Sequence, residues 1–204
     1  MEYILFKKEG HIATITLNRP KALNAFCSAM LSELAQAFEE ADKDKDIFCM
    51  VLNSACEKAF TAGGDVKEEN TMDTKAAYDF AVLGKKCMNA ISSFHAPVIT
   101  AVNGYCLGGG MEIILASDIT VASRNAKIGV PTINLGGIPG WGGTQRLPRL
   151  VGASRAKEIL ITGRSLDAEE CLRLNIIEYI ADDDKLMEKA YELAQIIADK
   201  PPIA

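Results

Sequence analysis

The chain has 204 residues and a formal net charge of −5, from 22 basic and 27 acidic side chains. Apolar residues make up 49% and charged residues 24%, which is the composition of a globular protein with a core rather than of a disordered chain. The basic residues form no dense stripe, so composition argues against binding of nucleic acid or of an anionic membrane. The acidic composition still allows the protein to bind one anionic small molecule, because a few lysines and backbone N–H groups can hold such a ligand locally.

The cysteines and the apolar stretches limit the compartment and the kind of site. Six cysteines occur without a C-x-x-C spacing and only two histidines are present, so we expect no metal site. Cysteines scattered among apolar neighbours are typical of reduced core thiols in a cytoplasmic protein. The chain starts without a signal-peptide pattern, and its longest uncharged stretch, 87–111, contains Pro97 and several glycines, which excludes a membrane span.

The predicted elements alternate between strands and helices. Alternating apolar residues over 3–17, with a turn at Glu9-Gly10, predict a β-hairpin. Apolar positions at helical spacing predict helices over 28–41, 74–91, 109–116, 144–150, 154–161, 167–174 and 184–199, and short apolar runs predict strands over 47–52, 97–102, 119–122 and 176–180. Segment 129–143, rich in Gly and Pro, is expected to be a structured loop. This alternation predicts an α/β fold with largely parallel strands, in one domain over 1–204.

Two glycine-containing loops follow predicted strands, with the sequences FTAGGD (60–65) and YCLGGG (105–110). Glycine lets the backbone approach a ligand closely, and a helix that begins at Gly109 directs its first free N–H groups outward. Two such groups that converge on one oxygen would form an oxyanion hole. The alternative is that these glycines serve only turns and close packing.

Glu112 is the first charged residue after the uncharged stretch, and apolar residues follow it on the same predicted helix. A carboxyl group buried there would have a raised pKa, which suits a general acid or base near neutral pH. The alternative is a surface or ion-paired glutamate. His11 is expected in a solvated hairpin turn and His95 at a helix end, where a capping role is favoured over catalysis.

The sequence resembles the enoyl-CoA hydratase/isomerase (crotonase) family, most of all its bacterial hydratases. The resemblance is carried by NRPKALNAF (18–26), KAFTAGGDVKE (58–68), PVITAVNGYCLGGGMEIILASDI (97–119) and GIPGWGGTQRLPRLVG (137–152). It implies a spiral of ββα units assembled as homotrimers or dimers of trimers. Family members continue with further helices, so the resemblance also implies that the C-terminal helical region is incomplete after about residue 200.

The same resemblance implies an acyl-CoA thioester substrate and no cofactor apart from the coenzyme A of the substrate. The thioester oxygen would be held by the N–H groups of Gly64, where many members have alanine, and Gly109. The first catalytic glutamate of the hydratases falls on Glu112. The positions that match the family's substrate- and CoA-binding residues are Lys21, Ala22, Leu23, Ala62, Asp65, Val66, Lys67, Leu107, Gly108, Pro131 and Trp141.

The second catalytic glutamate of the hydratases falls on Thr132, which is where the sequence departs from the family pattern. A threonine hydroxyl can hold a water molecule but has no suitable pKa for proton transfer near neutrality. Three hypotheses follow: hydration of an enoyl-CoA with Glu112 and a water positioned by Thr132; isomerisation, decarboxylation or thioester hydrolysis at the same oxyanion hole; or binding of acyl-CoA without catalysis.

Overall fold

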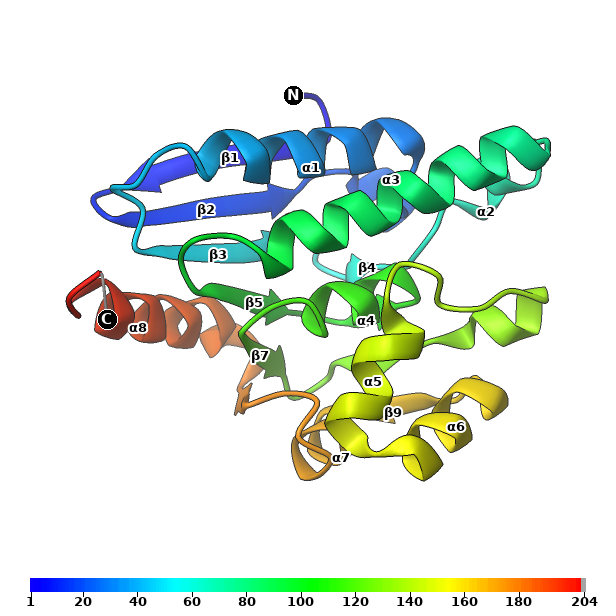
Figure 1. The fold of residues 1–204 in the computed structure, drawn as a ribbon. Helices are drawn as coiled ribbons and strands as arrows, with labels where there is room; N and C mark the ends of the chain where they lie inside the picture. The colour runs from blue at the N-terminus through cyan, green and yellow to red at the C-terminus, as the bar shows by residue number, and fades with distance from the viewer. Residues whose placement is uncertain (203–204) are drawn as a thin grey trace.

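The computed structural model describes residues 1–202 (Figure 1). The chain forms two β-sheets, and successive segments of the chain contribute strands to each of them in turn. The larger sheet has the order β1-β2-β3-β5-β7-β10. Only the β1–β2 hairpin in it is antiparallel, with Ile4 opposite Leu17. Its strands are β1 (Ile4–Glu9), β2 (Ile12–Leu17), β3 (Cys49–Ser54), β5 (Val98–Val102), β7 (Ile119–Ser123) and β10 (Tyr179–Ala181).

The smaller sheet has the order β4-β6-β8-β9, and its first three strands are parallel. Its strands are β4 (Ala59–Thr61), β6 (Tyr105–Leu107), β8 (Lys127–Gly129) and β9 (Ser165–Asp167). Each turn of the chain gives one strand to each sheet, as β3 then β4, β5 then β6, and β7 then β8, before helices return the chain. This is the predicted spiral of ββα units.

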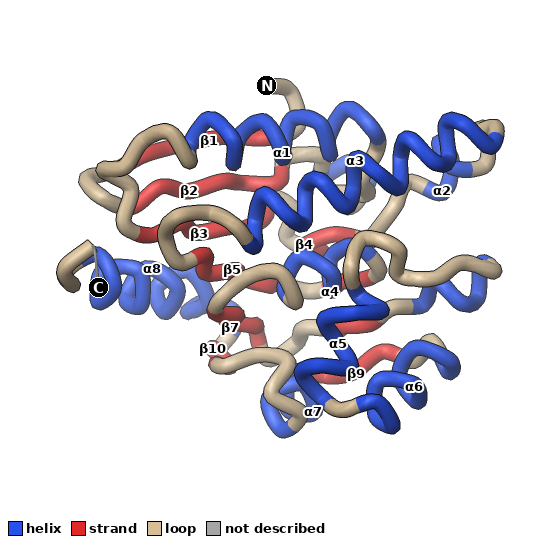
Figure 2. The backbone as a smooth tube through the Cα atoms, in the orientation of Figure 1, coloured by secondary structure: helices blue, strands red, loops and turns tan. Residues whose placement is uncertain are grey.

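Helices cover both faces of the larger sheet and carry the chain between the two sheets (Figure 2). The helices are η1 (Pro20–Ala22), α1 (Ser28–Ala41), α2 (Val66–Glu69), α3 (Thr74–Ser92), α4 (Gly109–Ile114), η2 (Pro131–Leu135), α5 (Gly143–Val151), α6 (Ala153–Thr162), α7 (Ala168–Arg173), η3 (Asp183–Lys185) and α8 (Leu186–Ala198). Aspartate caps fix three of the starts: Asp65 accepts the N–H of Lys67 in α2, Asp73 accepts that of Ala76 in α3, and Asp167 accepts that of Glu170 in α7.

The alternation of side chains along the larger sheet divides the core in two. Met50 and Leu52 of β3 pack into the core that contains α1 and α3. Val51, between them, faces the opposite way and packs with Ala190 and Ala194 of α8. Each face of the larger sheet is therefore buried against its own helices, which explains why its central strands read as continuous apolar runs.

The sequence predicts the hairpin and α1 with their bounds, and the remaining predicted helices within a few residues. The third strand begins at Cys49 instead of Ile47, and the last strand is Tyr179–Ala181 rather than 176–180. The four strands of the smaller sheet are missed, because three residues are too few to show a period.

The expected capping role of His95 is wrong. Helix α3 ends with Ser93 as its C-cap. The His95 ring instead lies 2.8 Å from the Asp42 carboxylate through Nδ1 and 3.0 Å from the carbonyl oxygen of Ile47 through Nε2. It therefore links the end of α3 to the connection between α1 and β3.

Candidate active site

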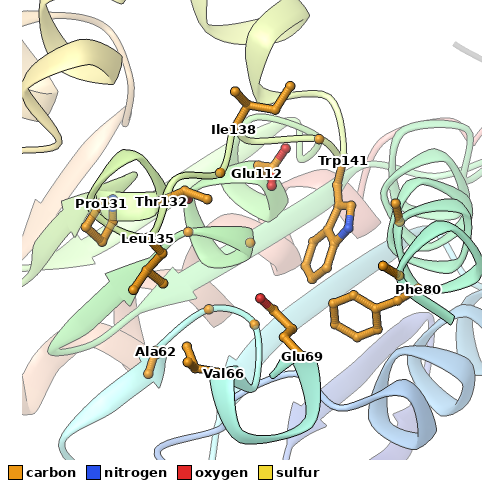
Figure 3. A pocket seen from close by; sticks show the side chains of 18 of the residues that line it. Ala62, Val66, Glu69, Phe80, Glu112, Pro131, Thr132, Leu135, Ile138 and Trp141 are labelled. Carbon is orange, nitrogen blue, oxygen red and sulfur yellow. The ribbon is translucent and has the colours of Figure 1, made fainter. Parts of the chain in front are cut away.

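A cavity of about 390 Å³ opens where the chain leaves the strands of the smaller sheet. Its walls come from the loop after β4, from α2 and α3, from the start of α4, and from the segment between β8 and α5 (Figure 3). The lining residues are Ala62, Gly63, Gly64, Val66, Glu69, Met72, Ala77, Phe80, Ala81, Gly108, Gly109, Glu112, Pro131, Thr132, Leu135, Gly137, Ile138, Gly140 and Trp141. Two carboxyl groups, Glu69 and Glu112, face an otherwise largely apolar enclosure.

Gly64 and Gly109 both present backbone N–H groups at this cavity. The Phe26 N–H donates to the carbonyl of Gly63 at 2.7 Å and the Phe26 carbonyl accepts the Asp65 N–H at 2.9 Å, so the loop is fixed on each side of Gly64. Gly109 is the first residue of α4 and has no intrahelical acceptor for its N–H. Within residues 1–202 neither N–H donates to a protein acceptor, so both remain for a ligand oxygen.

Glu112 lies in the second half of α4 and is only 3% exposed. Its Oε1 accepts the N–H of Gly143, the first residue of α5, at 2.8 Å. Burial raises the pKa of Glu112 to about 7, and the hydrogen bonds from the backbone of Gly143 and Trp141 hold it below the value that burial alone would give. The carboxyl group can thus exist in both protonation states near neutral pH, as the sequence predicts.

Trp141 both packs the loop and forms a wall of the cavity. Its indole lies edge-on to Phe26 at 6.0 Å and to Phe80 at 5.5 Å between ring centroids. A Cβ atom on Gly84 of α3 or on Gly109 of α4 would overlap the indole ring. Glycine at position 109 therefore makes room for the tryptophan in addition to exposing its N–H.

Thr132 lies on η2, where its hydroxyl faces the loop of Gly108. It lines the cavity at the edge opposite Trp141 and Phe80 (Figure 3). None of the residues of η2, Pro131–Leu135, carries a carboxylate. The position to which the sequence resemblance assigns the second glutamate of the hydratases therefore carries only a hydroxyl group.

The structure brings together all four residues predicted for catalysis. Of the predicted substrate-binding residues, those that also line the cavity are Ala62, Val66, Gly108, Pro131 and Trp141. Those that do not line it are Lys21, Ala22, Leu23, Asp65, Lys67 and Leu107. Leu23 is nevertheless adjacent, since its carbonyl accepts the N–H of Ala62 at 3.0 Å. Asp65 has a local role as the N-cap of α2 and as the partner of Arg19 at 2.7 Å.

Several lining residues escape the sequence reasoning, and Glu69 is the most important of them. It ends the charged segment Asp65–Glu69, which resembles a solvated helix face. Phe80 is an apolar position of the helix expected over 74–91, and no local pattern marks it as facing a cavity. Leu135 and Ile138 lie in the segment expected to be a loop, where no periodic pattern marks an inward position.

Among residues 1–202, no group of three or more His, Cys, Asp and Glu side chains is arranged to hold a metal ion. In the same part of the chain, no helix has the length and apolar character needed to span a membrane. The cavity holds two carboxyl groups, of Glu69 and Glu112, and two backbone N–H groups, of Gly64 and Gly109, that could stabilise a developing negative charge.

Known proteins resemble this chain in sequence and in fold. The chain is 41% identical over 201 residues to a short-chain-enoyl-CoA hydratase of Clostridium acetobutylicum, a match that covers 98% of this chain and 77% of the relative. It is 36% identical over 203 residues to a crotonyl-CoA hydratase of Syntrophomonas wolfei, covering 100% of this chain and 78% of the relative. The crystal structure of an enoyl-CoA hydratase from Bacillus anthracis superimposes with a TM-score of 0.95 at 37% identity, over 98% of this chain and 78% of that one.

A second solved structure, of Pseudomonas aeruginosa DspI, gives a TM-score of 0.95 at 34% identity and covers 100% of this chain and 77% of that chain. The model of the family described as enoyl-CoA hydratase/isomerase matches residues 7–204. With the ββα spiral, these matches show that the chain belongs to the enoyl-CoA hydratase/isomerase family of enzymes, the crotonases.

Proposed function

We propose that the protein is a hydratase that adds water across the 2,3 double bond of an enoyl-CoA thioester. The observation that carries this proposal is the placement of Glu112, a buried carboxyl group that titrates near neutral pH, in the same cavity as the unpaired N–H groups of Gly64 and Gly109. The two N–H groups would stabilise the enolate oxygen that forms when water adds to C3. Glu112 would take the proton from that water, which the Thr132 hydroxyl helps to hold.

The substrate in this proposal carries a short acyl chain. A cavity of about 390 Å³ must accept the thioester, the double bond and the attacking water, and Trp141 and Phe80 close one side of it. Two of the relatives carry the names short-chain-enoyl-CoA hydratase and crotonyl-CoA hydratase, which supports the same chain length. The CoA moiety would lie outside the cavity against Lys21–Leu23, Lys67 and Leu107. The reaction needs no other cofactor.

The test is turnover of crotonyl-CoA, followed by loss of the absorbance of the conjugated thioester. We expect Glu112→Gln to lower kcat by roughly 10²–10⁴-fold, because the amide cannot accept a proton from water. Glu40→Gln, on the exposed face of α1, is the control and should retain parental activity. Folded parental protein that gives no turnover above background with a series of enoyl-CoA esters would refute the proposal.

Decarboxylation of a malonyl-type CoA ester is the second candidate, and Thr132 is the observation that favours it. Decarboxylation needs the two N–H donors to stabilise the enolate but does not need a second base. The two candidates differ in their response to Glu112→Gln, which should abolish hydration but leave decarboxylation measurable. Product masses after incubation with enoyl- and malonyl-CoA esters distinguish them directly.

We further propose that the chain assembles as a homotrimer or a dimer of trimers and acts in the cytoplasm on acyl-CoA esters. Exposed apolar side chains support assembly: Ile161 is 68% exposed and Ile138 is 71% exposed. Six free cysteines, five of them buried, support a reducing compartment. Light scattering coupled to size-exclusion chromatography measures the assembly, and a mass equal to the single 22.0 kDa chain would contradict this part of the proposal.

A further inference from the structure

Helix α2 and its N-cap Asp65 carry three carboxyl groups, and two of them have protein partners. The Asp65 carboxylate accepts the Lys67 N–H at 3.1 Å and pairs with Arg19 at 2.7 Å. The Glu68 carboxylate accepts the Ser28 N–H at 3.0 Å and the Ser28 hydroxyl at 2.6 Å, which fixes α2 against the start of α1. These contacts hold both sides of the helix and direct Glu69 toward the cavity.

The Glu69 side chain has neither a hydrogen-bond nor an ion-pair partner within residues 1–202. Figure 3 shows it rising from α2 into the cavity, beside Phe80 and below Trp141, with Glu112 on the far side. Burial, together with the negative charges of Asp65 and Glu68, raises the pKa of Glu69. Glu69 is also an exposed residue, so its carboxyl group is free to meet a water molecule or a ligand that enters the cavity.

The Glu69 carboxyl group also adjoins the backbone that is expected to hold the thioester. A Cβ atom at position 64 would overlap Glu69 Oε1. The backbone of Gly64 does not have a positive φ, so its conformation does not require glycine, and the overlap involves the far end of the Glu69 side chain. Glycine at position 64 thus lets a carboxyl oxygen reach the atoms next to the oxyanion-hole N–H, where C2 of a bound thioester would lie two bonds from the thioester oxygen.

We propose that Glu69 is the second proton-transfer group of this site and takes over the task for which Thr132 is unsuited. The inference rests on the proposed hydration. Water adds its oxygen to C3 while the Glu112 carboxylate takes one of its protons, and the electron pair of the double bond moves to the thioester oxygen as an enolate. The enolate then returns its electron pair to C2, which takes the proton of the Glu69 carboxylic acid.

The balance of this sequence is one water molecule added. Glu112 is left protonated and Glu69 ionised, and exchange of one proton with solvent restores both groups. Run in reverse, the Glu69 carboxylate removes a proton from C2. The same step predicts that the protein exchanges the C2 protons of a saturated acyl-CoA with solvent, a reaction that involves no water addition.

The experiment compares the parent with Glu69→Gln, which keeps the size of the side chain and removes proton transfer. Glu178→Gln is the matched control, because Glu178 is also a partly buried carboxyl group with a raised pKa but accepts the Thr120 N–H at 2.7 Å, outside this cavity. Two rates are measured for each protein: hydration of crotonyl-CoA, and incorporation of deuterium at C2 of butyryl-CoA in deuterated water, read by mass. Urea unfolding establishes that each variant is folded.

We expect Glu69→Gln to lower kcat for hydration and the rate of C2 exchange by roughly 10²-fold or more, with KM changed less than about threefold. Glu69→Asp, which keeps a shorter acid, should retain more of both rates than Glu69→Gln and replaces it if the amide variant does not fold. Rates within about threefold of the parent, or a change confined to KM, would overturn the proposal.

The outcomes separate this proposal from the proposed function. If the parent hydrates crotonyl-CoA and Glu69→Gln does so equally well, the hydratase stands and the role of Glu69 is refuted. If the parent does not hydrate but exchanges C2 protons in a Glu69-dependent manner, hydration is refuted and the proton transfer by Glu69 stands. If the folded parent does neither, both are refuted.

Discussion

Glu112 is a buried acid whose burial is compensated by one good hydrogen bond. Oε1 accepts the Gly143 N–H at 2.8 Å, yet desolvation still raises the pKa to about 7 from the ordinary 4.5 of a glutamate. A carboxyl group held in this way is a cost to the fold whenever it is ionised, and that cost is the physical counterpart of its usefulness as a base.

The pH dependence of stability should report this cost. Because the pKa is raised in the folded state, the contribution of Glu112 to stability is complete below about pH 4.5 and is lost as the pH rises through about 7. We expect the parent to lose about 2–3 kcal/mol of unfolding free energy relative to Glu112→Gln between about pH 5 and about pH 8.5. Urea unfolding of both proteins at the two pH values measures the difference, and parallel curves would show that Glu112 does not titrate in this range.

The two glutamates of the cavity differ in how far the sequence reveals them. Glu112 interrupts a long uncharged stretch, so its burial follows from its neighbours. Glu69 follows another glutamate in a charged segment, and only the bonds of Asp65 to Arg19 and of Glu68 to Ser28 turn it inward. Those bonds join α2 to segments some 40 residues earlier in the chain, which no local pattern can report.

At the scale of elements, a helix–indole contact fixes the wall of the site. Gly84 of α3 and Gly109 of α4 leave the space that Trp141 fills, so the three segments lock together around one ring. The sequence predicts α3 and α4 from their periodicity but not this contact, since glycine in the middle of an amphipathic helix gives no sign of which partner fills its space. The three-residue strands that place α4 are likewise invisible to periodicity.

Gly84→Ala tests whether this contact is as tight as it looks. Alanine favours a helix over glycine by about 1 kcal/mol, but here its methyl group would displace the indole, which costs about 1–3 kcal/mol. We expect net destabilisation of about 1 kcal/mol and a rise in KM for the acyl-CoA. Asn89→Ala, exposed on the same helix, should be neutral or slightly stabilising. A Gly84→Ala protein as stable as the parent in urea unfolding would show that the ring has room to move.

At the scale of the whole molecule, the larger sheet separates two cores with different tasks. The core on the side of α1 and α3 reaches Trp141 and therefore supports the cavity. The core on the other side packs β3, β5 and β7 against α8, and the Tyr191 hydroxyl of α8 lies 2.9 Å from that of Thr14 in β2. The general alternation of strands and helices is predicted from the sequence, whereas the division of the core depends on which residue of each strand faces α8.

A charge placed in the second core should destabilise the fold without altering the chemistry of the site. Ala194 of α8 is completely buried against the sheet, and Ala194→Asp would leave an unpaired carboxylate there. We expect a loss of at least about 3 kcal/mol in unfolding free energy, with kcat per folded molecule close to that of the parent. Ile196→Asp, at a position 48% exposed on the same helix, is the control. Equal stability of the two variants would contradict the packing described for α8.

The chain contains a single tryptophan, and the fold places it in the wall of the cavity rather than elsewhere in the core. Its fluorescence is therefore a built-in optical reporter of that wall. Light at the red edge of the indole band selects Trp141 over the tyrosines, so the emission signals whether an acyl chain has entered beside the ring and whether α3 and α4 still enclose it. Ligand titrations and unfolding curves can be recorded on the unlabelled protein, with each intensity change assigned to one residue.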